Sequence, residues 1–371
     1  MKSFVNIKNQ RGGIFMKAII CREFKNYMKN PLYWVGIIIL IISIYSSLSG
    51  YLDIHIFSSS QEAKQLKEVS PTDADVMNGY IPTTEEEQID IGLKNIKQTF
   101  VDSYDMSEQE AEQAIQDVKA QNLSIAGTIE YLENEYQFYD GKAVFIEAEQ
   151  KKATSDELNE YMESRLSEHS YAYYFTKKYV DFTGFHVAFF SGILLAFLFI
   201  RDMKKDTYEL LHTKPVSAGG YVLGKYFGGI LPLSLAVLII TTIFTVLCQR
   251  NELQTNIIDS IGNMLIGTAL YVMPTVLITT GIYVFISLLF RNPLPSLPLI
   301  LAYIVYSNMG SYDVNGNYGF YGQILGMLFR FEGKFFETEV LPVFLLNQIA
   351  LLLLTVLFVG IGIWRWRKRR L

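Results

Sequence analysis

Residues 226–248 read YFGGILPLSLAVLIITTIFTVLC, a run without a single charged side chain. A helix needs about 20 predominantly apolar residues to cross the hydrocarbon core of a membrane. Half of the 371 residues are hydrophobic, and they are concentrated in blocks of this kind. The sequence therefore predicts a mainly α-helical, polytopic membrane protein. We expect six transmembrane helices, at residues 32–52, 182–200, 226–248, 264–290, 294–309 and 340–364.

Three of these blocks have individual features. No small-residue cleavage site follows 32–52, so we interpret this block as a retained anchor rather than a secretory signal. The block at 264–290 is long and contains Pro274, which predicts a tilt or a bend because proline removes a helix hydrogen bond. The block at 294–309 is the shortest of the six.

Lysine and arginine counts near the ends of the spans predict the orientation of the chain. With the N-terminus inside, the inner segments hold 18 basic residues and the short outer segments hold three. Positively charged loops stay on the cytoplasmic side of the membrane. We therefore expect a multi-pass protein of the cell membrane with both termini in the cytoplasm.

A large acidic insertion separates the first two spans. Residues 53–180 carry 26 acidic and 11 basic side chains, a net charge of −15, so the rest of the chain carries +10. We expect an extracellular domain that is mostly helical, with a solvated acidic surface. Ser107 and Glu110 have the spacing of a helix-capping box, and a turn is expected near 121–124. Asp140 and Gly141, between two short apolar runs, suggest a small hairpin.

The N-terminal segment 1–31 is expected in the cytoplasm. Within it, 16–30 (MKAIICREFKNYMKN) places its apolar residues on one helical face and its lysines and arginine largely on the other. This pattern is typical of an amphipathic helix lying along the inner leaflet. Met16 is an alternative translation start, because the Arg-Gly-Gly upstream of it resembles a translated purine-rich ribosome-binding site. That interpretation favours a bacterial source.

Residues 218–229 (AGGYVLGKYFGG) almost match the loop that binds nucleotide phosphates. Such a loop needs a serine or threonine after its lysine to hold magnesium, but Tyr226 follows Lys225 here. The loop also lies between two spans rather than after a buried strand. We therefore predict no nucleotide site. Gly219, Gly220 and Gly224 are interpreted as turn and close-approach residues, and Lys225 as an inner-face anchor whose ammonium reaches the lipid headgroups.

Catalytic and metal sites are not expected. The two cysteines, Cys21 and Cys248, lie on different segments, and the four histidines are scattered along the chain. No spacing suits a metal site, a catalytic triad or a bound cofactor. The sequence therefore predicts a protein that is not itself an enzyme, and nothing in it indicates nucleic-acid binding.

A longer stretch around this loop resembles a known family. Residues 208–232 (YELLHTKPVSAGGYVLGKYFGGILP) are similar to a segment of permease subunits of ATP-binding cassette (ABC) transporters of the type 2 export class. The matching positions are Glu209, Leu210, Leu211, Thr213, Pro215, Tyr221, Leu223, Gly224 and Lys225. The six spans and the large outer insertion also resemble this family.

The resemblance implies a division of labour between subunits. ATP hydrolysis would take place in separate ABC ATPase subunits, which contact a coupling loop at 201–225. The candidate contacts are Asp202, Lys205, Glu209, Leu210, Leu211, His212, Thr213 and Pro215. A second copy of the permease, or a homologous one, would complete the pathway among the membrane lipids. The resemblance also implies export or extraction of an amphipathic cargo, such as a peptide antibiotic or a lipid-like molecule, and with it antimicrobial peptide resistance.

The segment 307–339 is rich in aromatic residues and glycine, which is typical of the membrane interface. We expect a short helix at the outer boundary, serving either as an aromatic anchor or as a gate for hydrophobic cargo. The candidate gate residues are Tyr318, Phe320, Tyr321 and Phe329.

Other function classes remain open at this stage. The main alternative is a membrane-anchored sensor or scaffold whose extracellular domain binds a ligand. Transport driven by an ion gradient is disfavoured because the predicted spans carry almost no deep ionisable residues. Asp181 and His186, near the outer end of the second span, are interpreted as structural rather than as a proton relay. A lipid-modifying enzyme would need clustered acidic or histidine residues at the span ends.

Overall fold

The chain folds into two compact units in the computed structural model. Unit 1 comprises Met1–Leu52 and Ser170–Leu371, and unit 2 comprises Asp53–His169. The structure describes residues 2–368 except for 67–68, 205–206, 208, 210, 212–215, 313–317, 320–321, 332, 339 and 341–342. The sequence placed the end of the insertion at 180. The structure instead starts a helix of unit 1 at Tyr171, because the Ser170 side chain caps its N-terminus.

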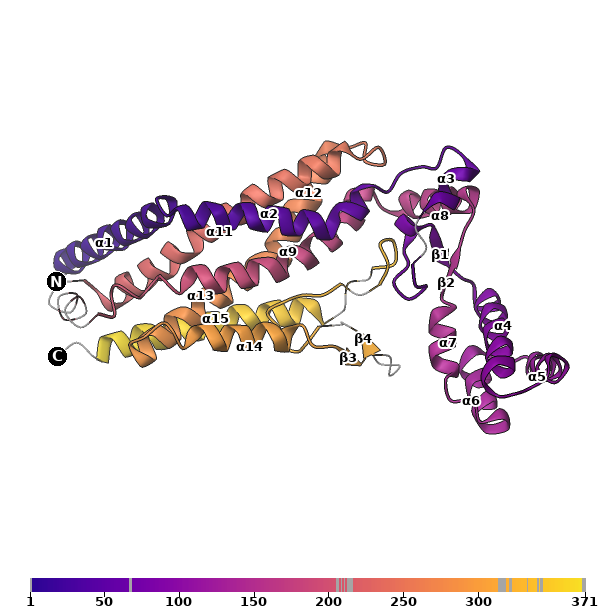
Figure 1. The fold of residues 1–371 in the computed structure, drawn as a ribbon. Helices are drawn as coiled ribbons and strands as arrows, with labels where there is room; N and C mark the ends of the chain where they lie inside the picture. The colour runs from indigo at the N-terminus through magenta and orange to yellow at the C-terminus, as the bar shows by residue number, and fades with distance from the viewer. Residues whose placement is uncertain are drawn as a thin grey trace. The chain divides into compact units, whose positions relative to one another are not determined.

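Unit 1 is a bundle in which helices from both parts of the chain lie side by side (Figure 1). Its helices include α1 (Lys2–Met28), α2 (Pro31–Leu52), α9 (Tyr171–Leu195), α11 (Ala218–Arg250), α12 (Ile257–Gly267), a π-helical turn (Thr268–Val272), α13 (Met273–Phe290), α14 (Ser296–Ser307) and α15 (Phe344–Lys368). Two short antiparallel strands, β3 (Ser311–Tyr312) and β4 (Tyr318–Gly319), follow α14.

Among the described residues of unit 1, four helical stretches are long and apolar enough to cross a membrane. They are α2, α11, the continuous stretch Ile257–Phe290 and α15. The second predicted span falls on α9, but this helix also includes the charged residues Lys177, Lys178 and Asp181. The fifth falls on α14, which has 12 residues and is shorter than a bilayer-spanning helix.

The irregularity expected at Pro274 takes the form of a π-helical turn. The N–H of Met273 reaches back to the carbonyl of Thr268, five residues earlier. Pro274 then occupies the first turn of α13, where its missing N–H costs no hydrogen bond. The chain therefore passes from α12 to α13 without leaving a helical conformation.

Helix α1 packs closely against α11. The amphipathic pattern itself is present, with Lys17 and Lys25 exposed and Tyr27 buried. The apolar side meets α11, where a Cβ at Gly224 would come within 3.0 Å of Ile19 and one at Gly228 within 2.9 Å of Glu23. Glycines four residues apart let two helices approach closely. The interpretation of Gly224 as a close-approach residue therefore fits the structure, and the position of α1 along the inner leaflet stays a prediction.

Hydrogen bonds between helices add to the packing inside unit 1. The Tyr33 hydroxyl of α2 donates to the Pro232 carbonyl of α11 over 2.7 Å. Pro232 lies in the interior of α11, within the third predicted span. The Tyr179 hydroxyl of α9 lies 2.9 Å from that of Thr241 in α11. Such contacts satisfy polar groups that have no water partner inside a membrane.

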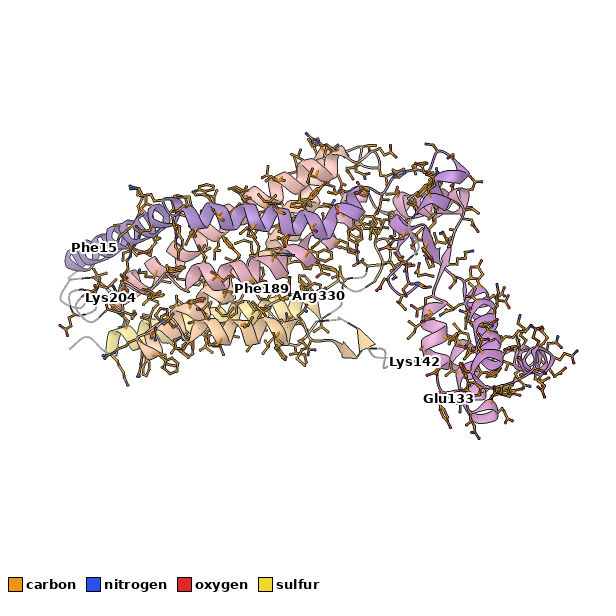
Figure 2. All side chains as sticks on the ribbon, viewed as in Figure 1. Phe15, Glu133, Lys142, Phe189, Lys204 and Arg330 are labelled. Atoms are coloured by element: carbon orange, nitrogen blue, oxygen red, sulfur yellow. The ribbon has the colours of Figure 1, made fainter. Side chains whose placement is uncertain are left out.

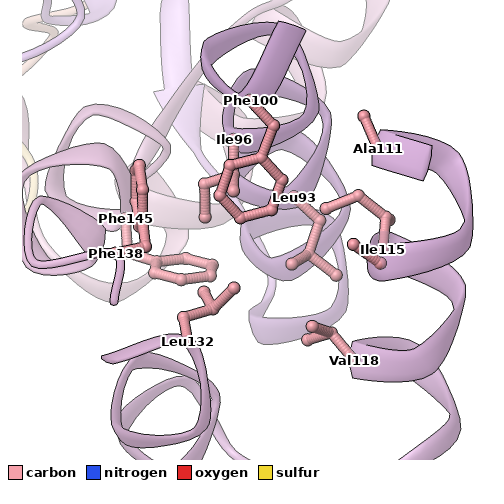
Figure 3. Packing of buried hydrophobic residues seen from close by; sticks show 10 residues of the cluster. Leu93, Ile96, Phe100, Ala111, Ile115, Val118, Leu132, Phe138 and Phe145 are labelled. Atoms are coloured by element: carbon pink, nitrogen blue, oxygen red, sulfur yellow. The ribbon is translucent and has the colours of Figure 1, made fainter. Parts of the chain in front are cut away.

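Unit 2 has its own hydrophobic core, shown in Figure 3. Its elements are α3 (Ser60–Gln65), a 3-10 turn (Val76–Asn78), β1 (Tyr80–Pro82), α4 (Glu85–Ser103), α5 (Glu108–Ala120), α6 (Ile125–Tyr136), α7 (Gly141–Glu147), β2 (Gln150–Lys152) and α8 (Ser155–Glu168). Phe100 of α4, Ile115 of α5, Leu132 of α6 and Phe145 of α7 meet in the core. Strands β1 and β2 pair antiparallel, with Ile81 opposite Lys151.

The local sequence signals in unit 2 had different outcomes. Ser107 and Glu110 form the expected capping box at the start of α5, and the expected turn separates α5 from α6. The hairpin expected around Asp140 and Gly141 was wrong. These residues instead begin the short helix α7, because Phe145 is buried against Gly92 of α4 and a helix delivers it there.

An ion pair joins the start of α4 to β2. The Lys151 ammonium donates to the Glu87 carboxylate over 2.6 Å, and the Thr84 backbone N–H donates to the same carboxylate over 3.0 Å. The Lys151 contact and, after it, the Thr84 bond lower the pKa of Glu87 below its ordinary value. A carboxylate of this kind stabilises the folded state above its ordinary pKa, and that stabilisation is lost as the pH falls.

Substitution at the α1–α11 contact provides a test of the packing. We expect Gly228→Ala to lower the stability of the full-length protein by about 1–3 kcal/mol, because the new Cβ is fixed to one helix and collides with the other. Thermal unfolding in detergent measures the effect. Gly219→Ala is the matched control, since a Cβ at this position meets nothing within 4 Å. Equal unfolding temperatures for the two variants would contradict the close approach.

The Glu87–Lys151 pair predicts an acid-sensitive unit 2. Stabilisation by Glu87 is complete above pH 4.5, the ordinary pKa of glutamate, and is lost progressively as the pH falls from there through the lowered pKa of the folded carboxyl. Hydrogen-exchange protection factors for α4 and β1, corrected for the intrinsic pH effect, should fall in this range. Glu87→Gln should weaken that pH dependence, whereas Glu86→Gln, one position earlier on the same helix, should keep it. The same pH profile in both variants would show that the pair has no such role.

Candidate functional site

A lysine is buried at one end of unit 1. Lys225 belongs to the second turn of α11, and only 3% of its surface is exposed. Burying an ammonium group is costly unless it is paired and hydrogen-bonded. The groups that satisfy Lys225 therefore define the local structure.

Lys225 is shared by two carboxylates from distant parts of the chain. Its Nζ lies 2.9 Å from Glu23 Oε1 of α1 and 2.6 Å from Asp202 Oδ2, in the segment after α9. Both carboxylates are buried as well. Nζ also donates to the Leu198 carbonyl over 2.9 Å. The Lys225 cluster, which we define as Glu23, Asp202, Tyr221 and Lys225, thus joins three parts of unit 1.

Tyr221 extends the Lys225 cluster to the C-terminal helix. It lies one helical turn before Lys225 on α11, and its hydroxyl donates to Asp202 Oδ2 over 2.8 Å. The Tyr221 ring stacks on Trp366 of α15, with ring centroids 4.1 Å apart and planes at 18°. Asp202 therefore binds both the Tyr221 hydroxyl and the Lys225 ammonium of α11. Because Tyr221 stacks on Trp366, a movement of Asp202 is coupled to α15 as well as to α11.

This geometry corrects the interpretation of Lys225. We expected its ammonium to reach lipid headgroups, but the two carboxylates and the Leu198 carbonyl hold it inside the protein. One lysine against two carboxylates leaves a net charge of −1 if all three are ionised. Removal of one partner from a buried ion pair costs about 3–5 kcal/mol, because it leaves an uncompensated charge.

The predicted ATPase contacts are only partly described. Asp202 is 5% exposed and belongs to the Lys225 cluster, so its side chain is buried within the permease itself. Glu209 is exposed and Leu211 is half-buried, and the backbone is helical at both positions. The other candidates lie outside the described residues: Lys205, Leu210, His212, Thr213 and Pro215.

A second group of buried charges lies on α9. Asp181 pairs with Arg330 over 2.5 Å, and the Phe331 backbone N–H donates to Asp181 over 3.2 Å. Lys177 and Lys178 donate to the carbonyls of Thr338 and Gly333. Figure 2 shows Arg330 and Lys204, a neighbour of Asp202, toward opposite ends of the bundle. Asp181 is thus buried and paired, in line with its structural interpretation.

The described part of 307–339 contains the two-residue strands β3 and β4 with turns, and no helix beyond the end of α14. Positive φ angles at Gly322 and Gly333 interrupt helical geometry, so the helix expected here was wrong. Of the candidate gate residues, Phe329 packs against Tyr271, Phe331 and Phe344. The side chain of Tyr318 and all of Phe320 and Tyr321 lie outside the described residues.

Comparison with known families identifies the protein class. The family model described as "ABC-2 family transporter protein" matches residues 17–315. The chain belongs to the ABC-2 transporter permease family. Comparisons with curated proteins and with solved structures gave no match. Membership makes the chain a membrane-embedded permease of a transporter family whose permeases associate with ABC ATPases and are generally not catalytic themselves.

Sequence reasoning missed most of the Lys225 cluster of this ABC-2 permease. Glu23, Asp202 and Lys225 all lie within the matched residues 17–315. Glu23 offered one signal, since it occupies the otherwise apolar face of α1 beside Ile19, Ile20 and Tyr27. A carboxylate on such a face requires a buried cation, but the sequence does not say which one.

The cluster predicts a graded response to charge removal. We expect Lys225→Met to lower the stability of the permease by about 3–5 kcal/mol, because Glu23 and Asp202 lose their shared cation. The triple variant Glu23→Gln, Asp202→Asn, Lys225→Met should regain part of this loss, because it leaves no charged group in the Lys225 cluster. Thermal unfolding in detergent measures both effects.

Lys25→Met, an exposed lysine of the same α1, is the control for the loss of a positive charge and should unfold like the original protein. A single Lys225→Met variant as stable as this control would show that the ion pairs contribute nothing.

Proposed function

We propose that this chain is the transmembrane subunit of an ABC transporter and that the segment 201–225 receives the motion of a separate ATPase. Family membership supports the transporter assignment. The observation that carries the coupling role is the bond between Asp202, at the start of that segment, and Lys225 of α11. Because Lys225 also binds Glu23, a displacement of the segment acts on α1 and α11 together.

Different residues of the segment have different roles in this proposal. Glu209 and Leu211 contact the ATPase, since neither is buried in the permease. Lys205, Leu210, His212, Thr213 and Pro215, from the same segment, are retained as further contacts. Asp202 is a positioning residue, because it acts through Lys225 rather than by touching the partner.

We propose that two permeases and two ATPase subunits form the complete transporter. The second permease is an identical or a homologous copy, and the pathway runs between the two. Each permease has six spans, which are the four long apolar stretches together with α9 and α14. Both termini lie in the cytoplasm of a bacterial cell, and unit 2 lies outside. Charge supports this orientation, because basic residues concentrate at the ends assigned to the inside.

The proposed cargo is an amphipathic molecule such as a peptide antibiotic or a lipid-like compound, which is exported or extracted from the membrane. Aromatic residues near the outer end support this class. Phe329 lies in a cluster with Tyr271, Phe331 and Phe344, and we assign it to the outer gate together with Tyr318, Phe320 and Tyr321.

A membrane-anchored sensor is the competing function. Unit 2 favours it, because this unit has a hydrophobic core of its own, as a separate ligand-binding domain would. The two functions differ in what the segment 201–225 does. A sensor has no need of an ATPase bound to this segment, whereas a transporter depends on it.

Alanine substitution at Glu209 and Leu211 tests the coupling. The full-length permease is co-expressed with the cassette ATPase that copurifies with it, and ATP turnover is measured in reconstituted vesicles. We expect Glu209→Ala with Leu211→Ala to abolish copurification or to reduce the permease-dependent ATP turnover at least about tenfold, corresponding to about 1.4 kcal/mol. The matched control is Glu252→Ala with Leu253→Ala, an adjacent Glu–Leu pair in the loop after α11.

Unchanged copurification and unchanged turnover in the Glu209 and Leu211 variant would rule out the coupling role. Equal losses in the test and control variants would point to a general defect of folding. Retained cargo transport without any ATPase would rule out the transporter mechanism as a whole.

A further inference from the structure

A cavity of about 450 Å³ lies beside the Lys225 cluster. Its walls come from the C-terminal part of α1, the junction with α2, the segment after α9, and Lys225 itself. These are the elements that the cluster joins. A molecule in this cavity would therefore contact both α1 and the start of the segment 201–225.

The cavity carries an excess of positive charge. Four cations line it, Arg22, Lys29, Arg201 and Lys225, against the two carboxylates of Glu23 and Asp202, which gives a net charge of +2. Lys225 already neutralises part of the carboxylate charge. Arg22, Lys29 and Arg201 are exposed, and none of the three forms an ion pair with a residue in the described part of the chain. Their charges remain available to an anion.

Apolar side chains border the same cavity. Phe197 lines it and is 54% exposed. At the nearby start of α2, Leu32 is 64% exposed, and Trp34 is 43% exposed while its indole N–H donates to the Met28 carbonyl. Tryptophan in this setting is typical of the headgroup level of a membrane. The surroundings therefore suit a ligand with an anionic head and an apolar tail.

We propose that the cavity binds the phosphate headgroup of an anionic phospholipid, held by Arg22 and Arg201, while the acyl chains extend over Phe197. This inference rests on the proposed placement of this end of unit 1 at the inner membrane surface. Anionic lipids give that surface a negative potential, and basic pockets between spans attract their headgroups. Guanidinium groups match phosphate oxygens in a bidentate geometry. Free phosphate lacks the tail that the apolar border accommodates.

The site gives the lipid a place in coupling. Arg22 neighbours Glu23 on α1, and Arg201 neighbours Asp202 after α9, so each proposed phosphate ligand adjoins one carboxylate of the Lys225 cluster. A bound headgroup holds α1 and the segment after α9 together from the cavity side. It therefore stabilises the arrangement in which Lys225 bridges the same two elements.

Lipid retention tests the proposal. The full-length permease is reconstituted in vesicles of phosphatidylcholine and phosphatidylglycerol, extracted, and analysed by native mass spectrometry for bound phosphatidylglycerol. We expect Arg22→Gln with Arg201→Gln to retain this lipid about 20- to 30-fold more weakly, the effect of removing two cations near the surface. Lys17→Gln with Lys25→Gln is the matched control, because both lysines are exposed on α1 and neither lines the cavity.

The remaining arms identify the source of the phosphate and exclude misfolding. Arg22→Lys with Arg201→Lys keeps the charge and should restore most of the retention. Glycerol 3-phosphate, the soluble counterpart of the headgroup, should displace the lipid poorly; efficient displacement would overturn the choice of a lipid. Equal retention by the glutamine and control variants would overturn the site. An unchanged thermal midpoint shows that each variant is folded.

This measurement is independent of the coupling experiment. Native mass spectrometry of the permease needs no ATPase, so loss of the lipid site leaves the coupling proposal standing. Failure of the Glu209 and Leu211 experiment likewise leaves lipid retention unaffected.

Discussion

The desolvated ammonium of Lys225 constrains the cytoplasmic-side architecture that we propose. A cation with 3% of its surface exposed needs anionic partners close at hand, and it draws one carboxylate from α1 and one from the segment after α9. Gly224 and Gly228 flank this lysine in the same helix and let α1 come close enough for Glu23 to reach it. The contact between α1 and α11 therefore depends both on the ion pair and on the spacing of the glycines.

Some elements of each unit could be predicted from the sequence, and others could not. Long apolar blocks predicted α2, α11 and α15 because hydrophobic length is a local property of the sequence. Helix caps in unit 2 were equally local, as at Ser107. By contrast, the helix starting at Gly141 depended on the fit of Phe145 against Gly92, which lies far away in the sequence. The start of α9 at Tyr171 was missed because the charged residues near it are typical of a solvated surface, whereas Lys177 and Lys178 bind the backbone carbonyls of Thr338 and Gly333.

The site was less predictable than the fold. The stretch around Lys225 carried the resemblance to a permease family, and the chain does belong to that family. Sequence reasoning assigned Lys225 to the lipid surface, because an isolated lysine near the end of a span is ordinarily able to reach the headgroups. Only three-dimensional proximity shows that the carboxylates of Glu23 and Asp202 pair with the Lys225 ammonium in place of the headgroups. Glu23 lies 202 positions before Lys225 in the sequence, and Asp202 lies 23 positions before it. The sequence pattern of α1 marks Glu23 as unusual, but no pattern identifies Lys225 as its partner.

The π-helical turn at Thr268–Val272 has a geometric consequence for the span that contains it. A turn closed by a bond between residues five apart holds an additional residue relative to an α-helical turn. One residue corresponds to about 100° of rotation in an α-helix, so the side chains of α13 are out of phase with those of α12. A single helical wheel drawn through Ile257–Phe290 therefore cannot describe which faces meet protein. Tyr271, which lies within this turn, stacks on Phe344 of α15 with the ring centroids 4.4 Å apart.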